Sequence, residues 1–447
     1  MNENFDLLIR GGSCVLSGSI VKTNIGVRGG KIIELGTLAS ARAAKIYNAN
    51  GLHILPGVID THVHFREPGF EYKENMKTGS ASAVLGGVTS VFEMPNNNPP
   101  TTSRATLKEK LDRADTSMHC DYAFYIGATS DNIDELAELE CLAGVAGVKL
   151  FMGSSTGNLL LARDDEILAA LRSGRRRISI HAEDETRLRE RFSLAMPGDP
   201  GTHPIWRDKE TARLATERLL RLARIAQRRV HLLHVTTLQE LPLLAAARDI
   251  ATVETTVQHL TLVAPNCYEE LGARAQMNPP LRKPCHQKAL WRAIDEGGID
   301  VVGSDHAPHT LAEKSGIYPQ TPSGLPGVQT LLTIMLDHVN AGRLSLERLV
   351  QLTSEGPARV FGISNKGLIA EGYDADFTIV DLKAKRKITD TWIKSRCGWT
   401  PYAGVQTTGW PIATILRGKI VMRDGDVAAT TTGMPISFTE AQCAKES

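Results

Sequence analysis

The sequence predicts an α/β protein: a (β/α)8 TIM barrel with a small β-sandwich domain built from both termini. Three observations support this prediction. Short strands separated by glycine pairs occupy residues 5–50, and short strands between glycines occur again after residue 365. Between these ends, eight apolar strands alternate with helical patterns, which is typical of a barrel. The first of these strands lacks the glycine-rich phosphate turn of a doubly wound open sheet.

The predicted sandwich domain covers residues 1–55 and 365–447. Its glycine pairs supply the positive φ angles that hairpin turns need. The strands expected there are 6–10, 24–28 and 31–35 in the first segment and 376–381 and 413–421 in the second.

The predicted barrel covers residues 56–364. We expect eight strands, the first of which begins in the last residues of the preceding segment. They are 52–62, 88–95, 121–128, 147–152, 177–183, 229–235, 251–257 and 299–305. The clearest helices are 208–228 and 238–248, where leucine and alanine recur at three- and four-residue spacing. Such a barrel carries its active site at the C-terminal ends of the strands.

Composition narrows the class of protein and its partners. The chain has 447 residues and a net charge of +1, so we expect no nucleic-acid or membrane partner. Its seven cysteines include no Cys-x-x-Cys pair, as expected for reduced thiols. No signal peptide or membrane-spanning apolar stretch is recognisable, and we therefore predict a cytoplasmic protein.

A His-x-His pair ends the first barrel strand. Side chains two residues apart on a strand point the same way, so His62 and His64 converge. Two neutral imidazoles at the mouth of a sheet suit a divalent transition metal. Taken alone, such a pair is about as often incidental as it is part of a metal site, because short motifs have a real false-positive rate.

Four further polar residues lie at expected strand ends: Lys149, His181, His234 and Asp305. Each alone has a structural explanation, such as a satisfied buried histidine, a lysine reaching for solvent or an aspartate capping a helix. Together, at one face of one barrel, they favour an active site.

Lys149 is the unusual member of this group. An ammonium has no lone pair, but a neutral lysine reacts with carbon dioxide to give a carbamate whose two oxygens can bridge two metals. Burial and nearby cations lower the pKa of a lysine and favour the neutral amine.

The motifs jointly resemble the amidohydrolase superfamily and, within it, the long-chain, two-domain dihydroorotases. The resemblance runs from about residue 6 to residue 425, and Phe-Arg-Glu-Pro-Gly with Asp-His-Ala-Pro-His is its most characteristic part. The segments that carry it are 60–69, 94–100, 147–152, 181–184, 231–235 and 305–309.

The resemblance implies two divalent metal ions, most often zinc, bridged by an N6-carboxylated Lys149. His62 and His64 would bind the more buried ion, and His181 and His234 the second. Asp305 would bind the first ion and act as the general base. Some long-chain relatives use an aspartate near strand four, but residues 151–155 hold none here, which supports Lys149 as the bridge.

The resemblance also implies a substrate pocket. Arg66, Asn96 and His309 match the residues that hold a substrate carboxylate, and Asn278 matches a further contact. Residues 310–324 resemble a loop that covers the substrate, although Ser323 stands where an aromatic residue is more frequent.

Four other polar residues near the motifs are expected to support the structure or to orient a ligand. We expect His231, His259 and His306 to be structural, with His306 pointing away from Asp305 because side chains alternate. Glu183 could orient a ligand histidine.

The implied reaction is the reversible hydrolysis of the cyclic amide of dihydroorotate to N-carbamoyl-L-aspartate in pyrimidine biosynthesis. A metal-activated hydroxide would attack the amide while Asp305 transfers the proton. The alternatives are a hydantoinase or allantoinase, whose neutral substrates offer Arg66 no carboxylate, and a non-catalytic scaffold. We expect a homodimer or homotetramer whose other partner is a small-molecule substrate. The sequence does not decide whether an aspartate transcarbamoylase associates with it.

Overall fold

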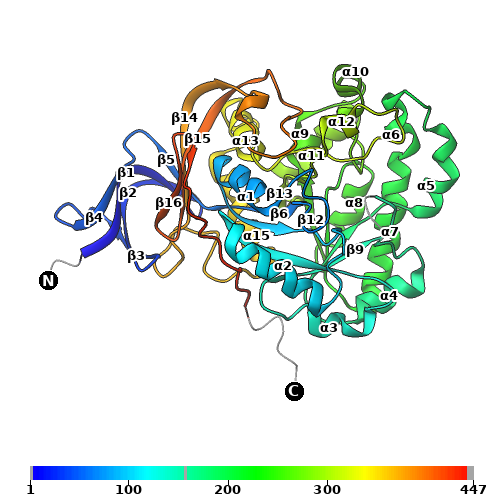
Figure 1. Ribbon diagram of the computed structural model, residues 1–447, viewed down its shortest axis with the longest axis horizontal. Coiled ribbons are helices and arrows are strands. Elements are labelled where there is room, and N and C mark those ends of the chain that lie inside the picture. The colour runs from blue at the N-terminus through cyan, green and yellow to red at the C-terminus, as the bar shows by residue number, and fades with distance from the viewer. Residues whose placement is uncertain (1–3, 156–158, 440–447) are drawn as a thin grey trace.

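The computed structural model describes residues 4–155 and 159–439 and contains two β-structures. One is a mixed sheet built from both ends of the chain, and the other is a parallel barrel wrapped by helices (Figure 1). In Figure 1 the blue N-terminal strands and the orange to red C-terminal strands lie together at one end of the molecule.

The barrel consists of eight neighbouring parallel strands, which confirms the predicted TIM barrel. Every residue in these strands is buried, as expected for a sheet covered on both faces. A bridge between Val63 and His306 brings the two outer strands together, and His64 N–H donates to the His306 carbonyl at 2.7 Å. The strands are β6 (Val58–Val63), β7 (Val88–Glu93), β8 (Asp121–Gly127), β9 (Val145–Phe151), β10 (Ile178–His181), β11 (Val230–Leu232), β12 (Ala251–Thr256) and β13 (Val301–Gly303).

Helices surround the barrel strands. The predicted helix 208–228 is α7 (Lys209–Ala226), which begins where the Asp208 carboxylate accepts the Thr211 N–H and ends at Gln227 in the left-handed region. The predicted helix 238–248 is shorter, α8 (Glu240–Ala245), and turns follow it. The other long helices are α1 (Met76–Leu85), α2 (Arg104–Ser117), α4 (Asp164–Arg172), α11 (Pro284–Asp295) and α13 (Leu331–Asn340).

The terminal segments form one nine-stranded mixed sheet. Its two halves join where β5 pairs antiparallel with β14, and their apolar side chains share a core that includes Leu7, Ile25, Phe377 and Ile415. The strands are β1 (Asn4–Leu16), β2 (Ser19–Arg28), β3 (Lys31–Gly36), β4 (Arg42–Asn48), β5 (His53–Pro56), β14 (Phe377–Lys387), β15 (Gln406–Leu416), β16 (Lys419–Arg423) and β17 (Asp426–Val427).

The expected first barrel strand, 52–62, is in fact two strands. β5 belongs to the terminal sheet, and β6 belongs to the barrel. Gly57 separates them, and its N–H donates to the Asp376 carbonyl at 2.9 Å. A Cβ at Gly57 would lie 2.3 Å from Thr89 Oγ1, so only glycine fits this close approach. The terminal sheet is therefore one residue away from the strand that ends in the two histidines.

A buried cluster of charges also joins the two structures. The Lys366 ammonium contacts Asp121 at 2.7 Å, Asp374 at 3.0 Å and Asp376 at 2.5 Å. Asp121 opens β8 of the barrel, whereas Asp376 directly precedes β14 of the sheet. Burying one cation among several carboxylates is tolerated because the charges are paired. In the described ranges, no helix has the length and apolar character needed to cross a membrane.

Candidate active site

His62, His64 and Asp305 form one tight group at the mouth of the barrel. The Nε2 atoms of His62 and His64 lie 3.2 and 3.3 Å from Asp305 Oδ1. One potential ligand atom from each residue lies within 4.8 Å of the others, and all three side chains are buried. Asp305 has a φ of 41°, a left-handed conformation that is unusual for a non-glycine residue and turns its carboxylate toward β6.

Hydrogen bonds fix which nitrogen of each histidine faces this group. His62 Nδ1 lies 2.7 Å from Glu254 Oε1, and His64 Nδ1 lies 2.7 Å from Asn96 Oδ1. Because both oxygens accept, each Nδ1 carries a proton, and each Nε2 is the nitrogen that would bind a metal ion beside Asp305. Asn96 therefore orients a predicted ligand, and its contact with a substrate remains a prediction.

Glu254 on β12 is a functional candidate that the sequence reading missed. Burial raises the pKa of its carboxyl group, but the imidazoles of His62 and His231 outweigh that effect and hold the pKa well below its usual range. A glutamate within a strand expected to be buried on both faces is rare unless paired, and its place inside the predicted strand 251–257 was the available signal.

His181 and His234 form a second pair beside the first. His181 Nδ1 lies 3.0 Å from His234 Nε2, and His181 Nε2 lies 3.0 Å from the Glu183 carboxylate. The proton of His181 is therefore on Nε2, and its Nδ1 lone pair faces His234. Burial lowers the pKa of both histidines and favours the neutral, ligating form.

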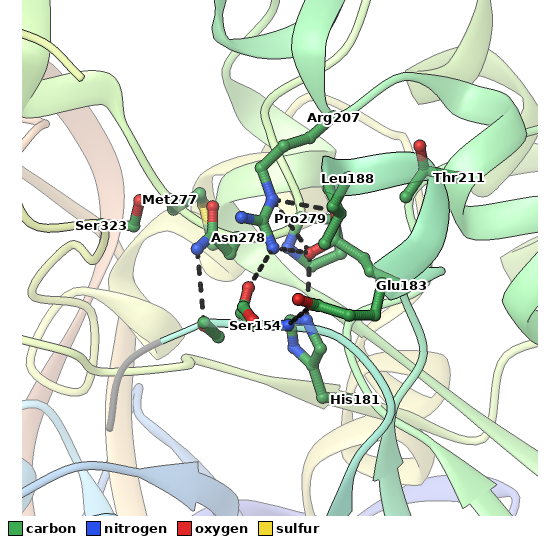
Figure 2. Close-up of polar contacts among 12 residues, drawn as sticks. Ser154, His181, Glu183, Leu188, Arg207, Thr211, Met277, Asn278, Pro279 and Ser323 are labelled. Carbon is green, nitrogen blue, oxygen red and sulfur yellow. Dashed lines mark hydrogen bonds and ion pairs between the residues drawn. The ribbon is translucent and has the colours of Figure 1, made fainter. Parts of the chain in front are cut away.

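Arg207 holds Glu183 in place (Figure 2). Its Nη2 lies 2.6 Å from Glu183 Oε2 and donates to the Ser154 carbonyl, also at 2.6 Å. Burial raises the pKa of Glu183, but the Arg207 guanidinium keeps it well below its usual range. The contact joins the partner of His181 to the chain that follows β9.

Lys149 lies among these histidines with its amine unsatisfied. Its side chain is 1% exposed, and Nζ has no hydrogen-bond partner within the described ranges. Nζ lies 4.5 Å from the centre of the Phe151 ring, and burial lowers the pKa to about 7. A large fraction of this amine is therefore neutral near pH 7. Four imidazoles, a carboxylate and a neutral amine fit a pair of divalent transition metals.

The predicted metal-site residues line one narrow cavity of about 20 Å³. Ser323 and Gly324, at the end of the loop 310–324, form part of its wall. Gly324 has a φ of 146°, and a Cβ there would lie 2.3 Å from the Ala307 carbonyl oxygen. The full lining is His62, His64, Lys149, Phe151, Ser155, His181, His234, Asn278, Asp305, Ala307, Ser323 and Gly324.

Arg66 and His309 lie together at the edge of this centre. Arg66 is 4% exposed, its Nε donates to the Pro308 carbonyl at 3.1 Å, and its Nη2 lies 3.1 Å from His309 Nε2. Burial lowers the pKa of Arg66 to about 10, so it stays charged at neutral pH. No carboxylate forms an ion pair with it in the part of the chain that the structure describes. A buried guanidinium with free donors suits an anionic ligand.

Asn278 faces the cavity from another side. Its Oδ1 lies 3.0 Å from His203 Nε2, and its Nδ2 lies 3.4 Å from Ser155 Oγ. The structure thus brings Asn278 to the same cavity as the predicted metal ligands, as its predicted role requires.

Three other histidines near the motifs form hydrogen bonds away from the metal-site residues. His306 Nδ1 accepts the Gly327 N–H at 3.0 Å, and its ring points away from Asp305. His231 Nδ1 lies 2.8 Å from Thr252 Oγ1, and His259 Nδ1 lies 2.7 Å from Thr256 Oγ1. These contacts fit the structural roles expected from the sequence.

Comparisons with known proteins agree with this geometry. The model of the amidohydrolase family matches residues 53–421. A dihydroorotase from Methanothermobacter thermautotrophicus is 35% identical over 409 residues, covering 90% of this chain and 92% of that protein. An allantoinase from Deinococcus radiodurans is 34% identical over 444 residues, covering 96% and 98%. The structure of an L-hydantoinase from Arthrobacter aurescens superposes with a TM-score of 0.92 at 29% identity, covering 97% of this chain and all of that one.

Proposed function

Because this chain belongs to the amidohydrolase family, we propose that it is a metal-dependent cyclic amidohydrolase whose substrate is dihydroorotate. The reaction is the reversible hydrolysis of that cyclic amide to N-carbamoyl-L-aspartate. The observation that carries this proposal is the buried Arg66 guanidinium near Asp305, which forms no ion pair with a carboxylate of the described residues.

The residues of the metal site would suit two divalent ions, zinc above all, and a carboxylated Lys149 would be a ligand to both. His62, His64 and Asp305 would hold one ion, and His181 and His234 the other. When bound, the metal pair supplies an activated water and polarises the amide carbonyl. The protein orients the ligands through Glu254, Asn96 and Glu183, which fix the proton on the outer nitrogen of three imidazoles.

Asp305 is the group placed to move a proton. Burial raises the pKa of its carboxyl group, but His62 and His64 outweigh burial and lower it, so the carboxylate is ionised and ready to accept. It takes the proton from the attacking water and gives it to the leaving amide nitrogen.

Arg66 and His309 select the substrate. Dihydroorotate carries a carboxylate on its ring, and that group would neutralise the buried guanidinium through charge-assisted hydrogen bonds. Hydantoin, allantoin and dihydrouracil have no carboxylate. With one of those substrates bound, the Arg66 charge would remain buried and unpaired, which is costly.

The test is turnover by metal-loaded protein on four substrates: dihydroorotate, dihydrouracil, hydantoin and allantoin. We expect dihydroorotate to have the highest kcat/KM by a wide margin. Preference for any of the neutral rings would overturn the assignment and place the protein with the hydantoinases or allantoinases. Two metals per chain without turnover of any substrate would favour the non-catalytic scaffold.

We further propose a cytoplasmic homodimer or homotetramer and the domain division 1–55 plus 365–447 around a barrel of 56–364. All the proposed site residues lie in the barrel segment. Light scattering measures the oligomeric state directly, and a monomer at micromolar concentration would contradict this proposal.

A further inference from the structure

Lys73 lies behind the proposed carboxylate pocket. It precedes α1, and its side chain is 12% exposed. Its Nζ lies 3.1 Å from His309 Nδ1 and 2.8 Å from Glu313 Oε1. The Lys73 ammonium therefore joins His309 to a carboxylate on the loop 310–324.

The contact with Lys73 determines which nitrogen of His309 carries a proton. An ammonium only donates, so His309 Nδ1 must accept and therefore has no proton of its own. A neutral imidazole with a free Nδ1 carries its proton on Nε2. The Ser323 carbonyl, 3.1 Å from Nε2, is an acceptor for that proton.

The result is two donors directed at one small region. The same Nε2 lies 3.1 Å from Arg66 Nη2, and neither of these protonated groups can accept from the other. An anion with two acceptor oxygens would accept from both, and would take the His309 Nε2 proton from the Ser323 carbonyl. With the opposite tautomer, Nε2 would direct a lone pair at that anion and repel it.

We propose that Lys73 is a specificity-determining positioning residue: it fixes His309 as an Nε2–H donor toward the substrate carboxylate. This inference rests on the proposed function. It concerns recognition of the carboxylate and leaves the metal centre untouched, since Lys73 contacts no predicted metal ligand in the described part of the chain.

The contact with Glu313 adds a link to the loop. Glu313 lies in α12 (Leu311–Lys314), and the Tyr72 hydroxyl also lies 3.2 Å from it. The Glu313 carboxylate compensates the charge of Lys73, so that the ammonium can remain buried beside Arg66. The same ammonium therefore contacts both His309 and the loop 310–324.

The test compares Lys73→Met with Lys73→Arg, using Lys77→Met as the matched control because Lys77 is exposed on α1. Methionine keeps the length without a donor, whereas arginine keeps donor and charge. The probes are orotate and uracil in calorimetric binding, and dihydroorotate and dihydrouracil in turnover, all on metal-loaded protein.

For Lys73→Met we expect orotate binding to weaken by about 10- to 100-fold, the size of a lost hydrogen bond to a charged group. The KM for dihydroorotate should rise similarly, while kcat stays within about threefold. Uracil binding, dihydrouracil turnover and metal content should not change, and Lys73→Arg should restore part of the loss. Equal losses for the carboxylate and neutral probes, or no loss at all, would overturn the inference.

A second readout does not depend on activity. Nitrogen-15 NMR of labelled histidines, with a His309→Gln spectrum for assignment, reports which ring nitrogen carries the proton. We expect the proton on Nε2 in the wild type and a change in Lys73→Met. A proton on Nδ1 in the wild type would refute the role of Lys73, whereas wild-type protein that ignores both orotate and dihydroorotate would refute the proposed function instead.

Discussion

Replacing Arg66 with methionine should lower the activity on dihydroorotate without lowering the stability of the fold. The side chain is almost completely buried, and it donates to the Pro308 carbonyl and approaches His309. Methionine occupies a similar length but carries no charge and no donor. The substitution therefore removes the proposed carboxylate contact while leaving the cavity filled.

The expected loss of activity follows from the contact that disappears. A charge-assisted, bidentate contact with a carboxylate contributes on the order of 2–4 kcal/mol to transition-state binding. This corresponds to a fall of roughly 30- to 900-fold in kcat/KM for dihydroorotate. Dihydrouracil has the same ring without the carboxylate, so any side activity on it should change by less than about threefold.

Most substitutions of buried residues lower the stability of a protein, but we do not expect Arg66→Met to do so. Burial lowers the pKa of Arg66 from 12.5 to about 10. Holding the charge at neutral pH therefore costs on the order of 3 kcal/mol, a cost present below the folded-state pKa. Losing the hydrogen bond to Pro308 removes about 1 kcal/mol of stabilisation and leaves the carbonyl unsatisfied. We expect an unfolding midpoint that is unchanged or higher.

The assay combines steady-state kinetics on both substrates, metal content per chain and thermal unfolding. Arg163→Met is the matched control, because that arginine is exposed and its guanidinium pairs with the exposed Asp165. Equal loss on both substrates, or a markedly lower unfolding temperature, would show that Arg66 supports the fold, and the reasoning would then be wrong.

Three other substitutions probe the metal centre. Lys149→Ala should lose the metal pair and nearly all activity, with partial rescue by a short carboxylic acid plus metal; two metals per chain and normal turnover would rule out the carbamate. Asp305→Asn keeps the shape but accepts no proton, so kcat should fall by about 10²- to 10⁴-fold, and a variant within about threefold of wild type would remove Asp305 from the mechanism. Glu254→Gln removes the negative charge from the partner of His62 and should weaken metal binding by about 10- to 100-fold in competition with a chelator. Unchanged metal affinity would make Glu254 a purely structural residue.

Local patterns were sufficient to predict the barrel and the histidine pair. Strand alternation placed His62 and His64 on one side and turned His306 away, as the structure shows. The division between β5 and β6 was missed as a strand break, although the predicted domain boundary at 55/56 lies beside it and Pro56-Gly57 is a dipeptide typical of turns. The pairing of β5 with β14, more than 300 residues away, shows that the two strands belong to different sheets.

Contacts between distant segments escaped the sequence analysis for the same physical reason. Glu254 becomes informative only when β12 lies beside the histidines of β6. Lys73 meets His309 across 236 positions of sequence, and no local spacing encodes that distance. Asn96 was assigned to the substrate from its motif, whereas its Oδ1 bonds His64 Nδ1.

The small size of the cavity that Ser323 and Gly324 line has a consequence for substrate affinity. About 20 Å³ at the metal-site residues is open to the centre of a water molecule, which is enough for a water but too little for a six-membered ring. Some of the lining must therefore move before a ring can bind, and Ser323 and Gly324 of the loop 310–324 belong to that lining. The open fraction is the fraction of molecules in which it has moved. The apparent dissociation constant then equals the intrinsic one divided by the open fraction, so a chain that is open 1% of the time would bind about 100-fold more weakly than its contacts allow. Contacts that stabilise the closed loop, such as Lys314 Nζ with the Gln276 and Pro322 carbonyls, thus set affinity without touching the substrate.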